Sequence, residues 1–200
     1  LLRACVWYTE HFKDDPLKTH VLSNGKPALE LSFKVPTGIH SPSGIEYYLC
    51  GHLDKIVEWN DQLWVLDRKT TKSDLNDHYF SGYTPDPQVS LYSLAAKIAF
   101  DLPIAGLIID GIQLLAAAAR FHRRPINRTD DQLEEWLTDL AYDLERAAGY
   151  AAAEHWPRND TACGNYGKCV MRDYCSAAPK ARKLYLGEFE TRVWDPTTPR

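Results

Sequence analysis

The feature that most constrains the fold is a pair of strand-like segments separated by a short polar break. Residues 45–59 and 63–71 are rich in aromatic and β-branched side chains, and Asn60, Asp61 and Gln62 lie between them. This arrangement is typical of a β-hairpin, in which two antiparallel strands are joined by a tight turn. The sequence therefore predicts two adjacent antiparallel strands here.

Charged residues lie within both predicted strands. Asp54 is in the first strand, and Asp67 and Lys69 are two residues apart in the second, so these last two project from the same face. If Asp54 reaches that face, two carboxylates and an ammonium group converge, and hard oxygen ligands of this kind suit Mg²⁺ or Mn²⁺. The alternative is a surface ion pair between Asp67 and Lys69. The apolar run 63–66, which leads directly into Asp67, favours the metal site. Gly51 favours it as well, because a residue without a side chain lets a ligand or another backbone approach closely.

Three motifs occur in a fixed order along the chain. They read Gly51-His52-Leu53-Asp54, Asp67-Arg68-Lys69-Thr70 and Gln88-Val89-Ser90-Leu91-Tyr92. In this order they resemble the motifs of the PD-(D/E)XK nuclease superfamily, in particular its RecB-like exonuclease branch. That branch includes phage, CRISPR-associated and AddB-type members with an iron–sulfur cluster. The resemblance extends over residues 28–176.

The resemblance implies a role for each matching residue. Asp54 and Asp67 would be ligands of Mg²⁺ or Mn²⁺, and Lys69 would be the catalytic lysine. The backbone carbonyl of Arg68 would complete the coordination. A lysine at this position can activate a water molecule or stabilise the charge that develops on the phosphate.

The resemblance extends to a helix and to a preceding strand. Gln88 and Tyr92 are four residues apart on a predicted helix, so they share one face, which in the family faces the nucleic acid. The alternative is that Tyr92 packs in the core. Glu30 is similar to the glutamate that relatives use as a third metal ligand, although it could be a solvent-facing strand residue. His11 and His20 do not match the family's upstream metal-binding histidine.

A second resemblance concerns the cysteines. Cys163, Cys169 and Cys175 are spaced six residues apart, which is neither Cys-x-x-Cys spacing nor a helical period. They resemble the C-terminal triplet that binds a [4Fe–4S] cluster together with one early cysteine, for which Cys5 is the candidate. A zinc site, disulfides or free thiols are the alternatives. Cys50 is expected to be a buried strand residue.

The formal net charge of −4 does not indicate nucleic-acid binding, but the charges are unevenly distributed. Four arginines lie in a compact basic stretch, and residues 130–145 are acidic. A local basic surface of this kind can follow a phosphate backbone, so the stretch is a candidate DNA-binding site, with a solvated loop as the alternative. These arginines are Arg120, Arg123, Arg124 and Arg128.

Composition predicts one globular domain. The chain has 200 residues, of which 44% are hydrophobic and 25% charged, enough for one sizeable core. We expect a nuclease core at about 28–160 and a cysteine-rich segment at 161–185, in a chain that could lack its own N-terminus. No stretch approaches the ~20 apolar residues of a membrane span. The odd number of cysteines, 5, favours a reducing compartment, the cytoplasm of a bacterium or phage-infected cell.

The predicted fold class is α/β, a mixed sheet flanked by helices, as in the PD-(D/E)XK core. A strand with a bend at Asp110-Gly111 is expected at 104–115, extended by residues 116–124. A helix should begin after Thr129, whose spacing to Gln132 is typical of an N-cap. The long loop 71–87 could gate substrate. The remaining predicted elements are strands at 28–35, 44–59 and 63–71 and helices at 1–13 and 88–100.

The expected function is that of a metal-dependent DNA exonuclease in recombination or repair, with a helicase or recombination protein as a candidate partner. One alternative is a catalytically silent DNA-binding or assembly module of a helicase–nuclease complex. The intact Asp54, Asp67 and Lys69 argue against a silent module, which has no chemical need for all three. Endonuclease action is another alternative, on which the motifs carry no information.

Overall fold

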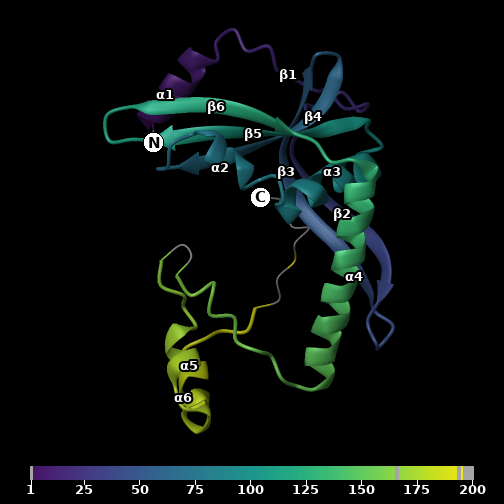
Figure 1. Cartoon of the computed structure of the whole chain (residues 1–200), viewed down its shortest axis with the longest axis vertical. Helices are drawn as coiled ribbons and strands as arrows, with labels where there is room; N and C mark the ends of the chain where they lie inside the picture. The colour runs from purple at the N-terminus through teal and green to yellow at the C-terminus, as the bar shows by residue number, and fades with distance from the viewer. Residues whose placement is uncertain (1, 165–166, 193–194, 196–200) are drawn as a thin grey trace. The chain divides into compact units, whose positions relative to one another are not determined.

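The computed structural model describes residues 2–164, 167–192 and 195 of the chain (Figure 1). The chain divides into two compact units, one extending to Tyr142 and one from Asp143 to Asp195. The strands are β1 (Lys18–Thr19), β2 (Leu29–His40), β3 (Glu46–Trp59), β4 (Gln62–Thr71), β5 (Ile104–Leu114) and β6 (Ala119–Ile126). The helices are α1 (Leu2–His11), α2 (Asp77–Ser81), α3 (Pro87–Phe100), α4 (Asp130–Ala152), α5 (Arg172–Ser176), the 3₁₀ helix η1 (Pro179–Ala181) and α6 (Arg182–Leu186).

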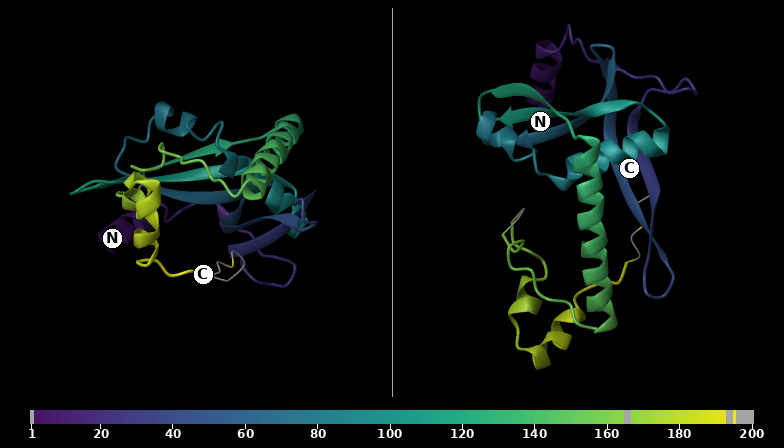
Figure 2. Two further views of the ribbon diagram at one scale, coloured as in Figure 1. Left: turned by 90° about the horizontal axis from the view of Figure 1, so that it is seen from below. Right: turned by 45° about the vertical axis from the view of Figure 1, so that its right-hand side comes forward.

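The first unit is built on one mixed sheet. Its strand order is β1-β3-β4-β5-β6, and β2 pairs with β3 (Figures 1 and 2). Strand β5 runs parallel to β4, to which α3 connects it, and the other pairings are antiparallel. Helix α3 packs on β2 and β5, and α1 packs on β6. The predicted α/β class, with a mixed sheet and flanking helices, is confirmed.

The core has two parts because side chains alternate along the central strands. Val65 of β4 belongs to a cluster that includes Val89 of α3. Its neighbour Leu66 belongs to a second cluster with Trp64 and Ile108. The central strands are thus buried on both faces, as their continuous apolar runs require. Any charged residue that follows in β4 must therefore lie close to one of these clusters.

The predicted hairpin is confirmed, with a shorter turn than expected. Gln62 pairs with Trp59 and belongs to β4, so only Asn60 and Asp61 form the connection. Their φ angles are 50° and 59°, the left-handed values that a type I′ turn requires at both central positions. Asn and Asp tolerate this conformation well, which explains why this dipeptide closes the hairpin.

The bend predicted at Asp110-Gly111 is wrong, because β5 continues without interruption through both residues. Residues 119–126 do not extend this strand but form β6, which turns back and pairs antiparallel with β5. Gly111 serves packing instead: a Cβ there would lie 2.8 Å from Cδ2 of Leu75 and 3.2 Å from Cζ of Phe80. The segment after β4 therefore packs closely over the sheet at this glycine.

Two helix starts agree with their sequence signals. Thr129 and Gln132 form a capping box, in which Gln132 N donates to Thr129 Oγ1 at 3.2 Å and Thr129 N donates to Gln132 Oε1 at 3.0 Å. The long loop after β4 contains α2, which Asn76 caps by accepting a hydrogen bond from Tyr79 N. Within the described ranges, no helix combines the length and apolarity needed to cross a bilayer.

Candidate active site

Asp67 and Lys69 lie at the end of the apolar part of β4, on the face that α3 covers. Lys69 Nζ is 2.8 Å from Asp67 Oδ2, and the side chain of Asp67 is 6% exposed and that of Lys69 27%. Oδ2 is nevertheless a buried atom with no hydrogen-bond donor among the described residues, so this contact is an ion pair without hydrogen-bond geometry. The side chain thus presents a charged oxygen with free coordination capacity.

Asp54 lies beside Asp67 on the neighbouring strand. Lys55 pairs with Leu66 in the β3–β4 register, which places Asp54 one step further, level with Asp67. Asp54 Oδ2 accepts a hydrogen bond of 3.0 Å from the backbone N of Arg68. The hairpin therefore brings together the two carboxylates that the motif order singled out.

Helix α3 supplies two further polar groups. Lys69 Nζ donates to Gln88 Oε1 at 2.7 Å, and Gln88 Nε2 donates to the Tyr92 hydroxyl at 3.0 Å. Gln88 and Tyr92 do share one face of the helix, and that face is directed at Lys69. Asp86 caps this helix, accepting from Gln88 N at 2.7 Å. A chain of contacts therefore runs from Asp67 through Lys69 and Gln88 to Tyr92.

The charges in the site shift one another's pKa values. Burial raises the pKa of Asp67, the carboxylates of Asp54 and Asp86 raise it further, and contact with Lys69 opposes the shift. Burial lowers the pKa of Lys69, but its contact with Asp67 outweighs this effect and the net shift is upward. Burial raises the pKa of Tyr92 as well. The carboxylates of Asp54 and Asp86 thus make the surroundings of Asp67 more negative, an environment that a bound cation would relieve.

Asp86 and Tyr83 were not predicted as members of this site. Both come from the loop that precedes α3, and Asp67 contributes to raising the pKa of Tyr83, after burial and a hydrogen bond of 3.0 Å with Tyr79. The sequence Pro85-Asp86-Pro87 signals the helix start. The proximity of Asp86 to Asp67, however, depends on the path of the loop across the sheet, which this local signal does not give.

Glu30 is not assembled with the two aspartates. It is exposed, and its φ of 49° interrupts the regular alternation of β2. In the part of the chain that the structure describes, no three His, Cys, Asp or Glu side chains are grouped as ligands of one ion. Of the two upstream histidines, His11 lies edge-on to Phe12 with ring centroids 4.6 Å apart, and His20 Nδ1 lies 2.8 Å from a Glu58 carboxylate oxygen.

The residues present fit a divalent cation such as Mg²⁺ or Mn²⁺. Asp54 and Asp67 provide hard carboxylate oxygens on adjacent strands, which both ions prefer. The fit rests on Asp67 Oδ2, which is buried beside other carboxylates and accepts no hydrogen bond from the described residues. A buried charged oxygen without donors is costly unless a cation compensates it, and Lys69 alone provides that here.

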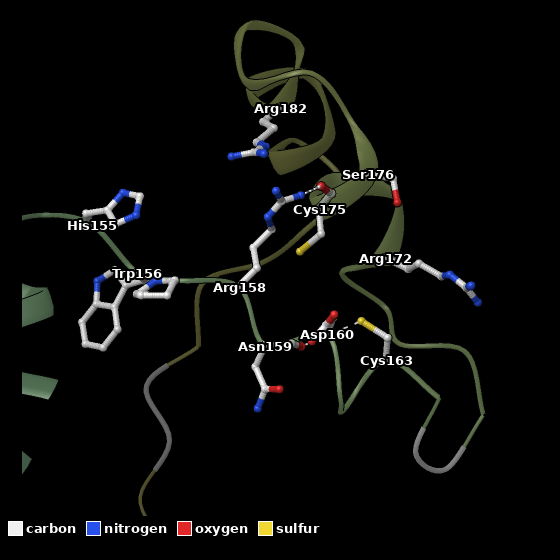
Figure 3. Close-up of a pocket in the computed structure, with 11 residues that line it drawn as sticks. His155, Trp156, Arg158, Asn159, Asp160, Cys163, Arg172, Cys175, Ser176 and Arg182 are labelled. Carbon is white, nitrogen blue, oxygen red and sulfur yellow. Dashed lines mark hydrogen bonds between the residues drawn. The ribbon is translucent and has the colours of Figure 1, made fainter. Parts of the chain in front are cut away.

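The gathered cysteine triplet expected in the second unit is not seen. Cys163 and Cys175 line a pocket of about 900 Å³, whereas Cys169 is not among its lining residues (Figure 3). All five cysteines of the chain carry free thiols, which excludes the disulfide alternative in this structure. Thiols have no attraction for one another that would gather them, and in metal sites the bound metal supplies that energy.

The four candidate DNA-binding arginines fall into two groups. Arg124 pairs across the sheet with Ile109, which pairs with Asp67, so Arg124 lies on the same row as Asp67. Arg120 is four residues earlier on the same face. Their side chains are 39% and 67% exposed and are paired with carboxylates of the segment after β4. These pairs are Arg124 with Asp77 at 2.5 Å and Arg120 with Asp74 at 3.5 Å.

The other two arginines are occupied by structural contacts. Arg123 alternates to the opposite face, where its side chain is 13% exposed and binds Asp15 at 2.7 Å and 3.0 Å. Arg128 donates to Ser90 Oγ at 3.0 Å and to the backbone carbonyls of Tyr83 and Asp86. Arg120 and Arg124 are therefore the two that remain accessible on the face of the site.

Comparison with known proteins gives a family match for most of the chain. The sequence profile of a family described as the PD-(D/E)XK nuclease superfamily matches residues 13–176. A search of curated proteins finds no match. Matching solved structures include one entitled "Crystal structure of SSO0001", with 17% sequence identity and a TM-score of 0.42. That match covers 86% of this chain, and the chain spans 66% of the length of that protein.

Proposed function

Because the chain belongs to the PD-(D/E)XK nuclease superfamily, we propose that it is a metal-dependent nuclease that hydrolyses phosphodiester bonds in DNA. The observation that carries the proposal is the buried Asp67, whose Oδ2 lacks a hydrogen-bond donor among the described residues while Lys69 Nζ lies 2.8 Å away. A carboxylate oxygen that is available to bind a metal ion, next to an ammonium group, is an arrangement suited to the hydrolysis of a phosphate ester.

Asp54 and Asp67 would hold the metal ion between β3 and β4. When bound, Mg²⁺ or Mn²⁺ supplies Lewis-acid stabilisation of the phosphate and lowers the pKa of a coordinated water. Asp54 is oriented for this role by the hydrogen bond from the Arg68 backbone N. Asp67 is oriented by its burial between the strand and α3.

Lys69 would neutralise negative charge that develops on the phosphate and would orient the attacking water. Gln88 accepts one of its N–H groups, which leaves the ammonium directed at the carboxylates. The Tyr92 hydroxyl accepts from Gln88, so its own proton is free to donate to a phosphate oxygen. Arg120 and Arg124 would contact the substrate backbone beyond the site.

The finer assignment to an exonuclease of recombination or repair rests on the resemblance to RecB-like relatives. The same resemblance implies a [4Fe–4S] cluster on Cys163, Cys169 and Cys175, and a zinc site is the alternative. We propose that such a centre stabilises the second unit. Anaerobically purified protein should show the charge-transfer absorbance of an iron–sulfur cluster, and Cys169→Ser should lose it.

The nuclease proposal is tested with end-labelled linear DNA, single- and double-stranded, in Mg²⁺, Mn²⁺ or EDTA. The wild type should release label only with metal, and Asp67→Asn should abolish release while remaining folded. Asp61→Asn is the matched control, because Asp61 is exposed in the hairpin turn and its φ of 59° suits asparagine. Comparison of the two labelled ends gives the polarity. If a folded wild type binds DNA but leaves every substrate intact, the chain is a silent binding module.

A further inference from the structure

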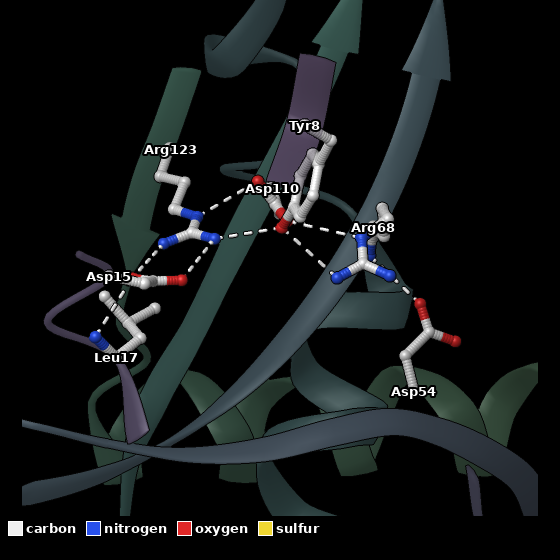
Figure 4. A network of polar contacts seen from close by, with 7 residues as sticks. All are labelled: Tyr8, Asp15, Leu17, Asp54, Arg68, Asp110 and Arg123. Carbon is white, nitrogen blue, oxygen red and sulfur yellow. Dashed lines mark hydrogen bonds and ion pairs between the residues drawn. The ribbon is translucent and has the colours of Figure 1, made fainter. Parts of the chain in front are cut away.

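A network of polar side chains lies on the face of the sheet opposite the candidate site (Figure 4). Its centre is Asp110, whose side chain is fully buried. Asp110 Oδ1 accepts from Arg123 Nε at 3.1 Å, while Oδ2 accepts from Arg68 Nε at 3.3 Å and from the Tyr8 hydroxyl in a short contact. Three strands and α1 therefore meet at one carboxylate.

The network follows from strand register. Arg68 of β4 pairs with Asp110 of β5, and Asp110 pairs with Arg123 of β6, so the three residues form one row across the sheet. Tyr8 closes the row from α1, with its hydroxyl accepting from Arg123 Nη2 at 2.9 Å and from Arg68 Nη2 at 3.2 Å. The guanidinium of Arg68 also lies 4.9 Å from the centre of the Tyr8 ring.

The charges of this network hold one another in place. A fully buried carboxylate is costly unless it is paired, and Asp110 is paired with two arginines. Arg123 is in turn held by both carboxylate oxygens of Asp15. Burial and contact with Asp110 raise the pKa of Tyr8, which keeps its hydroxyl protonated as a donor at neutral pH. Every member has a partner that fixes its position.

Arg68 connects this network to the candidate site. It is the middle residue of Asp67-Arg68-Lys69, so its side chain points to one face while those of its two neighbours point to the other. Its backbone N donates to Asp54 Oδ2 at 3.0 Å. A rotation of β4 about its axis would therefore break the contacts of Arg68 with Asp110 and Tyr8. The same rotation would displace Asp67, Lys69 and the donor to Asp54.

We propose that Arg68 is a positioning residue, held by Asp110 and Tyr8, which fixes β4 in the rotation that aims Asp54 and Asp67 at a common divalent cation. This role rests on the proposed nuclease function, and it makes α1 part of the catalytic apparatus, although α1 contributes no group to the site. Mutation of residues that orient metal ligands from behind typically costs about 10–100-fold in metal affinity or activity.

The test compares Arg68→Met and Tyr8→Phe with the wild type. Arg68→Met keeps an unbranched apolar stem and removes the guanidinium, whereas Tyr8→Phe removes only the bridging hydroxyl. Ile108→Val is the control, because Ile108 is buried in β5 on the same face and makes no polar contact with Arg68. The readouts are the Mn²⁺ dissociation constant without DNA, by electron paramagnetic resonance, and kcat and KM on labelled DNA.

Both Arg68→Met and Tyr8→Phe should weaken Mn²⁺ binding and lower kcat by about 10-fold or more, with KM for DNA changed less than about twofold. Arg68→Lys should restore only part of the loss, because an ammonium group cannot reach both partners with fixed geometry. Ile108→Val should lower thermal stability without changing Mn²⁺ affinity. Equal Mn²⁺ affinity in wild type, Arg68→Met and Tyr8→Phe would overturn the proposal.

Failure of the underlying function has a different signature. A wild type that binds Mn²⁺ but cleaves no DNA overturns the nuclease assignment, while the positioning role is still decided by the Mn²⁺ affinities of the variants. A wild type that neither binds Mn²⁺ nor cleaves DNA overturns both. Losses in the variants that merely follow their thermal stability, as in Ile108→Val, would assign the network to folding alone.

Discussion

Lys69 of β4 and Gln88 of α3 are joined by a hydrogen bond of 2.7 Å between Nζ and Oε1. The bond connects a strand to a helix across the site, and it leaves the ammonium group directed at Asp67. Gln88 thus helps to orient the ammonium group of Lys69. Its position in the family motif has a direct structural reason in this chain.

Replacing Gln88 by Ala should lower kcat by at least about tenfold. A hydrogen bond to a charged group contributes about 1.5–3 kcal/mol, and Lys69 without it can rotate away from the reacting phosphate. Single-turnover cleavage of labelled DNA measures the effect. Gln62→Ala, an exposed change at the start of the same strand, should leave the rate unaltered. Equal rates for Gln88→Ala and wild type would remove Gln88 from the site.

The raised pKa of Asp67 predicts a pH-dependent difference between the metal-free wild type and Asp67→Asn. At a pH below the ordinary aspartate value of about 3.9, the carboxyl group is neutral in both folded and unfolded chains and contributes no difference. Between that value and the raised folded pKa, the unfolded chain ionises more readily than the native state, so the wild type loses stability relative to Asp67→Asn. Above the folded pKa the difference stays constant. Urea unfolding between pH 4 and pH 8 should show this growing difference, with Asp61→Asn as the exposed control. A difference that is constant over this whole pH range contradicts the prediction.

With Mn²⁺ present, we expect the wild type to become more stable than Asp67→Asn. A cation that binds only the folded protein stabilises it by about 2.7 kcal/mol at a concentration 100 times its dissociation constant. Thermal unfolding with and without Mn²⁺ should therefore show a shift in the wild type and almost none in Asp67→Asn. A Ca²⁺ titration separates a general oxygen site from one that prefers the smaller ion. Equal shifts in both proteins would place the cation elsewhere.

Arg124 and Arg123 are adjacent, yet their replacement by Gln should have different effects. Arg124→Gln removes an accessible cation on the face of the site, so DNA binding should weaken and its salt slope should fall by about 1. Arg123→Gln breaks a buried pair with Asp110 and should cost about 3–5 kcal/mol of folding stability. Fluorescence anisotropy at several salt concentrations and urea unfolding measure the two effects. An unchanged salt slope in Arg124→Gln would exclude a phosphate contact there.

Gly111→Ala should loosen the segment that covers the sheet after β4. The new Cβ would lie 2.8 Å from Leu75 Cδ2 and 3.1 Å from the carbonyl oxygen of His122, so the segment must shift, at a cost of about 1–3 kcal/mol. Gly149→Ala in α4 is the matched control. Apart from its chain neighbours and its own helix backbone, no atom of the described residues lies within 4 Å of the added Cβ, and helix propensity favours Ala by about 1 kcal/mol. Thermal unfolding should show a lower melting temperature for Gly111→Ala and a higher one for Gly149→Ala.

The local parts of the fold were predictable because their signals are local. Asn60-Asp61 closes a hairpin through its own backbone preference, and Thr129 with Gln132 starts a helix through its own side chains. The spacing of Asp67 and Lys69 fixes their shared face for the same reason. The placement of Asp54 beside them depended on the register of the hairpin, which its two-residue turn determines.

The parts that failed depend on contacts distant in sequence. Asp110-Gly111 is an ordinary turn signal, but Asp110 is paired with arginines of two neighbouring strands and Gly111 makes room for Leu75. The compact basic stretch predicts one surface, but strand alternation places Arg123 on the opposite face from Arg124. The sequence signal for this pairing is the aspartate within the apolar run Ile104–Leu114, because a buried carboxylate needs a positively charged side chain nearby.

The parallel pairing of β4 with β5 has a consequence for protein synthesis. The strand that carries Asp67 and Lys69 gains its second neighbour only when residues up to Leu114 are available, since α3 must first return the chain to the same edge. Parallel pairings of this kind form late because the intervening chain must be ordered first. On the ribosome, the emerging polypeptide therefore carries the complete Asp-x-Lys motif well before the strand that pairs with β4 on its second side is available.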